Sequence, residues 1–291
     1  MSQRTKGILY MLFSSFSFAL MQVCVRMAGD LPSMQQSFFR NLFSLAVALF
    51  LIRRDKTPIR VPKAQWGHLF SRVFFGTVGV LCNFYAVDHM LISDASMLNK
   101  MSPFFATLFA IWLLKEKVTA VQLCLSLGAI GGCCLILKPT LSGLATPAGG
   151  IALLGGICAG MAYTNVRVLG THNVHKNIII LTFSAFSCLV TLPYLLFFYQ
   201  PMEAKQLLFL LLAGVAGAGG QFAITAAYTY APAREISVYD YTQVIFSAIL
   251  GFFLFGQLPD RYSVIGYILI CGMGVYMFLM TRRAVKNGQE S

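Results

Sequence analysis

Apolar stretches of about twenty residues recur along nearly the whole chain, and they constrain its fold more than any other feature. An α-helix rises about 1.5 Å per residue, so twenty residues span the hydrocarbon core of a bilayer, which is about 30 Å thick. Hydrophobic residues make up 57% of the 291 residues and charged residues only 11%, which leaves no room for a soluble domain. The pattern predicts an all-α membrane protein that crosses the lipid bilayer many times.

Ten stretches of this kind predict ten transmembrane helices. Short connections separate them, and most connections carry a proline or another residue that interrupts a helix. The first stretch resembles a signal peptide, but its apolar region is too long and lacks a small-residue cleavage site, so we expect it to be retained as a helix. The predicted spans are 7–28, 34–52, 66–87, 92–114, 119–138, 149–168, 178–198, 206–230, 236–256 and 262–281.

Positive charges alternate between the two sides of the predicted spans. With a cytoplasmic N-terminus, fifteen of the 22 Lys and Arg residues fall in cytoplasmic segments, four fall outside and three lie within spans. This bias predicts that both termini are cytoplasmic, as an even number of spans requires. The loops then explain the formal net charge of +12, and we expect no nucleic-acid partner. Short tails without an ER-retention ending favour a bacterial cytoplasmic membrane, although a eukaryotic membrane stays open.

The chain also contains an internal repeat. Residues 94–118 align with residues 235–259 at an offset of 141 positions, which places Asn99 over Asp240. Apolar helices resemble one another easily, so the aligned polar positions and the half-length offset carry this inference.

Each half of the chain holds five predicted spans. Because five is an odd number, the second half must enter the membrane from the opposite side. We therefore expect an inverted-topology repeat, with the first five-helix unit over residues 1–140 and the second over 141–291. In secondary transporters this symmetry places the substrate site near the middle of the membrane.

The repeated segments resemble a known family. "MSPFFATLFAIWLLKEK" (101–117) and "YTQVIFSAILGFFLFGQLP" (241–259) are similar to the two EamA-type repeats of the drug/metabolite transporter superfamily. The resemblance implies a ten-helix transporter but no particular substrate, since the superfamily includes exporters of amino acids and other metabolites as well as nucleotide-sugar and organic-anion carriers. One departure is Gln257, because the family commonly carries Glu at the end of the fourth helix of each repeat, as at Glu116.

Lys100 is an unusual residue for a transmembrane helix. It lies about eight residues into the span 92–114, roughly 12 Å from its outer end. An ionisable group within a membrane costs at least about 2.5–3.5 kcal/mol on insertion scales, so we expect Lys100 to face a cavity or a partner. Pro103 cannot donate a hydrogen bond to the carbonyl of Asn99, and its ring is expected to bend the helix. Helical spacing puts one polar stripe at Ser96, Lys100, Pro103 and Thr107.

The second repeat places Asp240 and Tyr241 where the first has Asn99 and Lys100. Symmetry is expected to bring the two regions to one central cavity, and our hypothesis is that Lys100 and Asp240 bind the substrate from opposite halves. Lys100 would attract a carboxylate or another anionic group, and Asp240 would bind an amine or take a proton. The alternative is an ion pair that only fixes the helix packing.

Further polar residues lie within the predicted spans or at their ends. Arg40 either snorkels to the outer headgroups or contacts the substrate, and Arg72 is interpreted as an anchor at the cytoplasmic end. Asp94 and Glu235 lie near span ends on opposite sides and are candidate coupling or gating residues, although carboxylates also stabilise helix N-termini. A set of amide and tyrosine side chains is expected to face inward, as substrate contacts or as helix–helix hydrogen bonds. This set comprises Gln22, Asn83, Tyr85, Tyr163, Asn165, Gln221 and Tyr228.

Catalytic and metal-binding constellations are not found in the sequence. The four histidines form no zinc motif, and the eight cysteines fall within spans as small packing residues. We therefore expect neither enzymatic activity nor a cofactor. The favoured function is a secondary transporter for a small polar metabolite, an amino acid or an organic anion such as a carboxylate, with protons as a candidate coupling ion. A channel and a non-transporting membrane protein stay open as alternatives, and so do a monomer and a homodimer.

Overall fold

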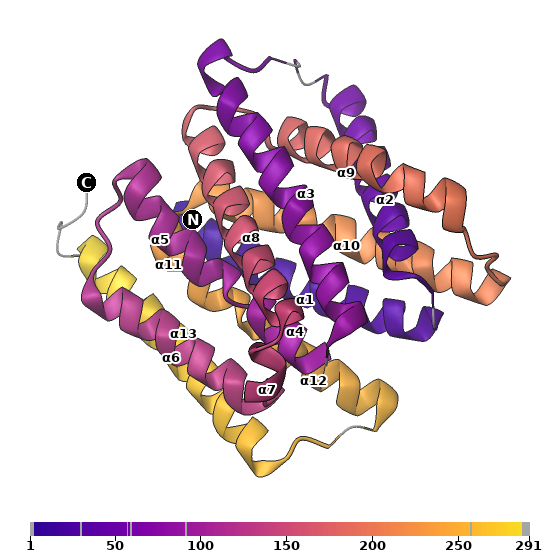
Figure 1. Cartoon of the computed structure of the whole chain (residues 1–291). Coiled ribbons are helices and arrows are strands. Elements are labelled where there is room, and N and C mark those ends of the chain that lie inside the picture. The colour runs from indigo at the N-terminus through magenta and orange to yellow at the C-terminus, as the bar shows by residue number, and fades with distance from the viewer. Residues whose placement is uncertain are drawn as a thin grey trace.

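The computed structural model describes residues 3–29, 31–56, 58, 60–90, 92–256 and 258–286, and all the secondary structure in these ranges is helical. The helices are α1 (Gln3–Ala28), α2 (Ser33–Arg54), the short 3₁₀ helix η1 (Lys63–Gln65), α3 (Trp66–His89), α4 (Ile92–Asn99), α5 (Ser102–Leu114), α6 (Ala120–Leu137), α7 (Leu141–Leu144), α8 (Pro147–Thr171), α9 (Lys176–Phe198), α10 (Ala204–Tyr230), α11 (Ala233–Asp240), α12 (Thr242–Phe255) and α13 (Arg261–Lys286). Figure 1 shows their arrangement.

Nine helical segments among the described residues are long and apolar enough to cross a membrane, with α4–α5 and α11–α12 each counted as one continuous span. The tenth predicted span corresponds to α3, whose 24 residues reach about 36 Å. The predicted all-α membrane protein of ten transmembrane helices in two five-helix repeats is therefore confirmed.

The fourth span of the first repeat is broken near its middle. Helix α4 ends at Asn99 and α5 begins at Ser102, so that Lys100 and Met101 lie between them. Pro103 occupies the first turn of α5, where its missing N–H costs no helical hydrogen bond. The sequence predicted a bend at Pro103, and the structure places a short turn at Lys100 and Met101 just before this proline.

The second repeat contains a corresponding break that the sequence did not predict. Helix α11 ends at Asp240 and α12 begins at Thr242, with Tyr241 between them and no proline nearby. The hydroxyl of Thr242 donates to the freed carbonyl of Tyr239 at 2.6 Å. Ser15 of α1 donates to the carbonyls of Tyr239 and Asp240 at 3.2 and 3.4 Å. Contacts from another helix therefore stabilise this break.

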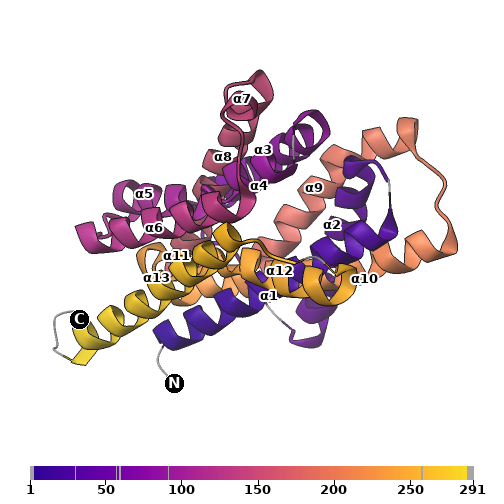
Figure 2. The same cartoon turned by 90° about the horizontal axis from the view of Figure 1, so that it is seen from below.

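The two repeats pack against each other in matching pairs of helices. Helix α1 lies along α10, and its counterpart α8 lies along α3, while α2 packs on α9 and α6 on α13. The broken helices follow the same rule, because α5 contacts α8 and α12 contacts α1. The start of α1 and the end of α13 lie at one face of the molecule, here called the terminal face (Figure 2). This arrangement places both breaks in the interior.

Close packing of α8 on the first broken helix depends on glycine. A Cβ atom added at Gly156 would lie 2.6 Å from the Leu98 carbonyl oxygen, and one added at Gly160 would lie 2.6 Å from Cβ of Phe105. Small residues at these positions let the backbones approach within the membrane. Gly156 and Gly160 are thus packing residues that support both halves of the broken helix.

Candidate functional site

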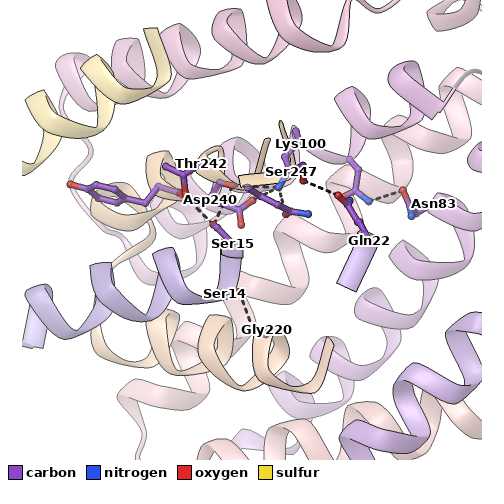
Figure 3. Close-up of polar contacts among 12 residues, drawn as sticks. Ser14, Ser15, Gln22, Asn83, Lys100, Gly220, Asp240, Thr242 and Ser247 are labelled. Atoms are coloured by element: carbon purple, nitrogen blue, oxygen red, sulfur yellow. Dashed lines mark hydrogen bonds and ion pairs between the residues drawn. The ribbon is translucent and has the colours of Figure 1, made fainter. Parts of the chain in front are cut away.

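The two helix breaks meet at an ion pair between the repeats. The Lys100 ammonium donates to the Asp240 carboxylate at 3.1 Å, to the Gln243 side-chain carbonyl at 2.6 Å and to the Asp240 backbone carbonyl at 3.4 Å. Only 13% of the Lys100 side chain and 9% of the Asp240 side chain are exposed. Figure 3 shows Lys100 and Asp240 pointing toward one another, with Ser15 and Thr242 beside them. The structure thus brings together two predicted site residues that are 140 positions apart.

Two of the pair's contacts were missed by the sequence reasoning. Gln243 follows Asp240 by three positions and therefore lies on the same side of the second broken helix, so its spacing was a usable signal. Ser15 stands in the apolar run "LFSSFSFAL", where several serines are equivalent in sequence. Only tertiary packing identifies Ser15 as the residue that reaches the broken backbone.

Hydroxyl groups extend the polar centre along both broken helices. Thr107 of α5 donates to Ser237 of α11 at 3.2 Å, which links the two repeats a second time. Tyr241 is fully buried, and its hydroxyl has no hydrogen-bond partner among the described residues. A buried hydroxyl generally needs water or another polar group as a partner. The region therefore has hydrogen-bonding capacity that the described protein groups do not use.

Tyr163 lies beside this centre. Its ring stacks on that of Tyr228, with centroids 5.1 Å apart and planes inclined by 7°. Asp240, Arg72 and Arg40 all act electrostatically on its hydroxyl. The charged groups that act on this predicted site residue thus come from three helices.

Three of the predicted amides, Asn99, Asn83 and Gln22, form two contacts nearer the opposite face. Asn99 of α4 donates to Asn83 of α3 at 2.6 Å, and Ser247 of α12 donates to Gln22 of α1 at 3.1 Å (Figure 3). Each contact joins a broken helix to a neighbouring continuous helix. Ser96 contributes its backbone carbonyl, which accepts the Lys100 amide at 3.0 Å.

Tyr85 lies away from the ion pair, and its side chain is 40% exposed. Its ring stacks on that of His89 with centroids 4.0 Å apart. Both residues line a pocket of about 280 Å³ between the start of α2 and the C-terminal parts of α3 and α9. The side chain of Asp94, a candidate coupling or gating residue, is outside the described part of the chain.

Ion pairs connect helices of both repeats at the terminal face. Glu235 is only 2% exposed and pairs with Arg4 of α1 at 3.3 Å and with Arg234 at 3.9 Å. Arg167 of α8 pairs with Glu116, just beyond α5, at 3.5 Å. Burial raises the pKa of Glu116, while the positive charges of Arg167 and Arg234 act in the opposite direction. The predicted gating residue Glu235 therefore belongs to a buried charge cluster.

A pairing of Glu116 with Arg167 was not predicted from the sequence. The segment "CVRM" (24–27) aligns with "NVRV" (165–168), so Arg26 of the first repeat corresponds to Arg167 of the second. Glu116 corresponds in the same way to Gln257, which lies outside the described residues. The repeat alignment therefore already showed that the arginine occurs in both repeats but the glutamate only in the first.

The anchor interpretation of Arg72 is wrong. Arg72 is only 2% exposed. Its guanidinium lies over the Phe183 ring, 4.2 Å from the ring centroid, and does not reach the end of α3. Gly76, one turn further along α3, leaves the space that the guanidinium fills, because an added Cβ there would collide with Nη1 of Arg72. Arg40 also turns inward, since its aliphatic stem packs over Gly217 of α10.

No cluster of three His, Cys, Asp or Glu side chains that could hold a metal is found among the described residues. The eight cysteines are all free thiols, at Cys24, Cys82, Cys124, Cys133, Cys134, Cys158, Cys188 and Cys271. The chemistry of the centre is therefore that of an ion pair, amides and hydroxyls.

Comparison with known proteins adds independent information. The model of the EamA-like transporter family matches residues 5–138 and 149–280. The pseudopaline exporter CntI of Pseudomonas aeruginosa is 29% identical over 91% of this chain and 93% of its own length. The S-adenosylmethionine uptake transporter of Rickettsia prowazekii is 22% identical over 98% and 96%. A crystal structure that is 15% identical superposes with a TM-score of 0.83 over 95% of this chain and 98% of that chain.

Proposed function

The chain belongs to the EamA-like transporter family and is a multi-pass membrane transporter, and we propose that it is an alternating-access secondary carrier whose substrate binds at the Lys100–Asp240 pair. The substrate we propose is a small polar metabolite, an amino acid or an organic anion such as a carboxylate. The observation that carries this proposal is the buried pair itself, held at the breaks of two helices, one from each repeat.

Broken helices suit substrate binding in the membrane because their ends expose polar backbone groups to an internal site. The N-termini of α5 and α12 both start at the centre, and each carries a partial positive charge that favours an anionic ligand. The backbone carbonyl and the carboxylate of Asp240 both accept hydrogen bonds from the Lys100 ammonium. A carboxylate of the substrate would replace Asp240 as the partner of Lys100, and a substrate amine would bind the released Asp240 carboxylate.

Exchange of partners explains how binding could change the conformation. The Lys100–Asp240 pair joins the two repeats directly, so a ligand that separates it weakens an inter-repeat contact. The pairs of Glu235 with Arg4 and of Glu116 with Arg167 link the two repeats at the terminal face. We propose that both termini are cytoplasmic and that these pairs break when the site opens toward the cytoplasm.

The relatives transport different compounds, so their names do not fix the substrate. One is described as an exporter of pseudopaline and another as an uptake transporter of S-adenosylmethionine. Both directions of transport therefore occur among similar chains. For this protein we propose protons as the first coupling ion to test, with the buried carboxylates Asp240 and Glu235 as candidate carriers.

The test is counterflow in liposomes reconstituted with purified protein, using labelled amino acids and carboxylates. We expect saturable exchange with at least one compound and its loss in Lys100→Ala, whereas Lys138→Ala serves as the matched control. Lys138 is a half-exposed residue at the end of α6 that pairs with Asp260 at 2.6 Å, away from the helix breaks. Wild-type rates in folded Lys100→Ala and Lys100→Arg would refute the site, and flux without saturation would support a channel.

A further inference from the structure

Positively charged side chains outnumber negatively charged ones around the Lys100–Asp240 pair. The inference drawn from this excess rests on the proposed function and extends it. Lys100 is neutralised by Asp240. The side chains of Arg40 and Arg72 make no hydrogen bond or ion pair with any described residue, although both charges act on Tyr163. The centre therefore carries two positive charges for which the described protein groups supply no partner.

The Arg72 side chain fits a specific niche in the protein interior. Its guanidinium lies on the Phe183 ring and occupies the space beside Gly76, and its Nε atom is buried without a partner. Contact with an aromatic face offsets only part of the cost of burying a cation. The side chain could have extended to the end of α3, which is only about 9 Å away, but it turns toward the middle of the helix.

Arg40 packs its side chain against α10. A Cβ atom added at Gly217 of α10 would lie only 2.9 Å from Cγ of Arg40. The glycine therefore leaves room for the aliphatic stem of this arginine. The sulfur of Met21 borders the same position. Two glycines on different helices thus create space for two guanidinium side chains near one tyrosine.

No described carboxylate is available to neutralise these arginines. Glu116 and Glu235 pair with arginines at the terminal face, and Asp240 pairs with Lys100. An uncompensated charge in a membrane interior is costly, and residues of this kind usually serve a ligand or an ion pathway.

We propose that Arg40, Arg72 and Tyr163 form a second, anion-binding subsite, so that the substrate is a small dianion. Each planar guanidinium presents a fork of N–H donors that matches a carboxylate or a phosphate. In this subsite the Tyr163 hydroxyl donates a further hydrogen bond to the bound anion. One anionic group of the substrate occupies this subsite, and the other displaces Asp240 from Lys100.

Thermal unfolding of the purified full-length protein with matched ligands tests the subsite. The probes are succinate, its monoamide and its diamide, which share one carbon skeleton and carry two, one and no negative charges. Malonate, glutarate and inorganic phosphate vary the spacing and the type of anion. We expect the melting temperature to rise most with a dianion, and the order of dicarboxylates against phosphate to show which anionic group is preferred.

Variants locate the effect within the molecule. Arg40→Gln and Arg72→Gln should each weaken the apparent affinity for the best dianion at least about tenfold, Arg72→Lys should weaken it less, and Lys138→Gln should leave it unchanged. Gly76→Ala should weaken it by displacing the Arg72 guanidinium. The control Gly67→Ala lies on the same helix, where nothing is within 4 Å of an added Cβ, and should have no effect.

Several results would overturn the subsite. It is wrong if no dianion stabilises the protein more than the diamide, or if folded Arg72→Gln and Gly76→Ala keep the wild-type response. Loss of the dianion response while counterflow still depends on Lys100 would refute this inference alone. Counterflow that is independent of Lys100 but sensitive to Arg72 would instead refute the proposed binding of substrate at Lys100.

Discussion

Removing Lys100 and Asp240 separately and together distinguishes a substrate site from an ion pair that only holds helices together. Lys100→Met leaves the Asp240 carboxylate without its cation, and Asp240→Leu leaves the Lys100 ammonium without its anion. Both side chains are nearly buried, at 13% and 9% exposure, so neither charge can be fully hydrated in the folded protein. Each single variant should therefore lose more stability than the double variant.

The structure sets the size of this effect. Breaking a buried ion pair typically costs about 3–5 kcal/mol, and the slight exposure of this pair favours the lower limit, about 3 kcal/mol. This loss corresponds to a fall in melting temperature of roughly 6–12 °C. The double variant removes both charges and should recover to within about 1 kcal/mol of the wild type, because replacement of a whole buried pair by apolar groups is often neutral.

Melting in detergent and counterflow in liposomes are measured on the same preparations. A substrate site predicts that the double variant regains stability but not transport. A purely structural pair predicts that both return together. Recovery of wild-type transport in Lys100→Met/Asp240→Leu would therefore refute the assignment of the pair to the substrate.

Three further predictions concern packing and pH. Gly160→Ala should reduce the unfolding free energy by about 1–3 kcal/mol and so lower the melting temperature, because its Cβ would lie 2.6 Å from Cβ of Phe105. The control Gly150→Ala should leave the melting temperature unchanged, because nothing lies within 4 Å of its added Cβ. Thr242→Val should cost about 1 kcal/mol in denaturant unfolding, since the Tyr239 carbonyl loses its 2.6 Å donor. Burial raises the pKa of Glu116 above 4.5, so its stabilising contribution is present below that value and is lost as pH rises through the folded pKa. The melting temperature of the wild type relative to Glu116→Gln should therefore fall over that pH range, and a constant difference would contradict the shift.

Hydrophobic length was sufficient to predict the membrane spans. The signal is local, since each helix must bury its own backbone over about twenty residues whatever its neighbours are. Pro103 likewise predicted an irregular fourth helix through a local backbone effect. The alignment of Asn99 with Asp240 then indicated which two regions meet, and the 3.1 Å contact of Lys100 with Asp240 agrees with that expectation.

Features that depend on tertiary contacts were not predictable in the same way. The break at Tyr241 has no proline, and it is stabilised by Ser15, a residue more than two hundred positions away. The inward turn of Arg72 depends on the ring of Phe183 in α9 as much as on Gly76 in its own helix. A single sequence gives spacing along one helix, but not which neighbouring helix completes a niche.

The binding affinity of a compound found by counterflow is the most direct test of the central claim. Isothermal titration calorimetry on the wild type, Lys100→Gln and Asp240→Asn measures this affinity without transport. If the pair binds the substrate, each substitution should weaken the affinity at least about tenfold, with Lys138→Gln unchanged. Wild-type affinity in both folded variants would show that the substrate binds elsewhere and that the Lys100–Asp240 pair has only a structural role.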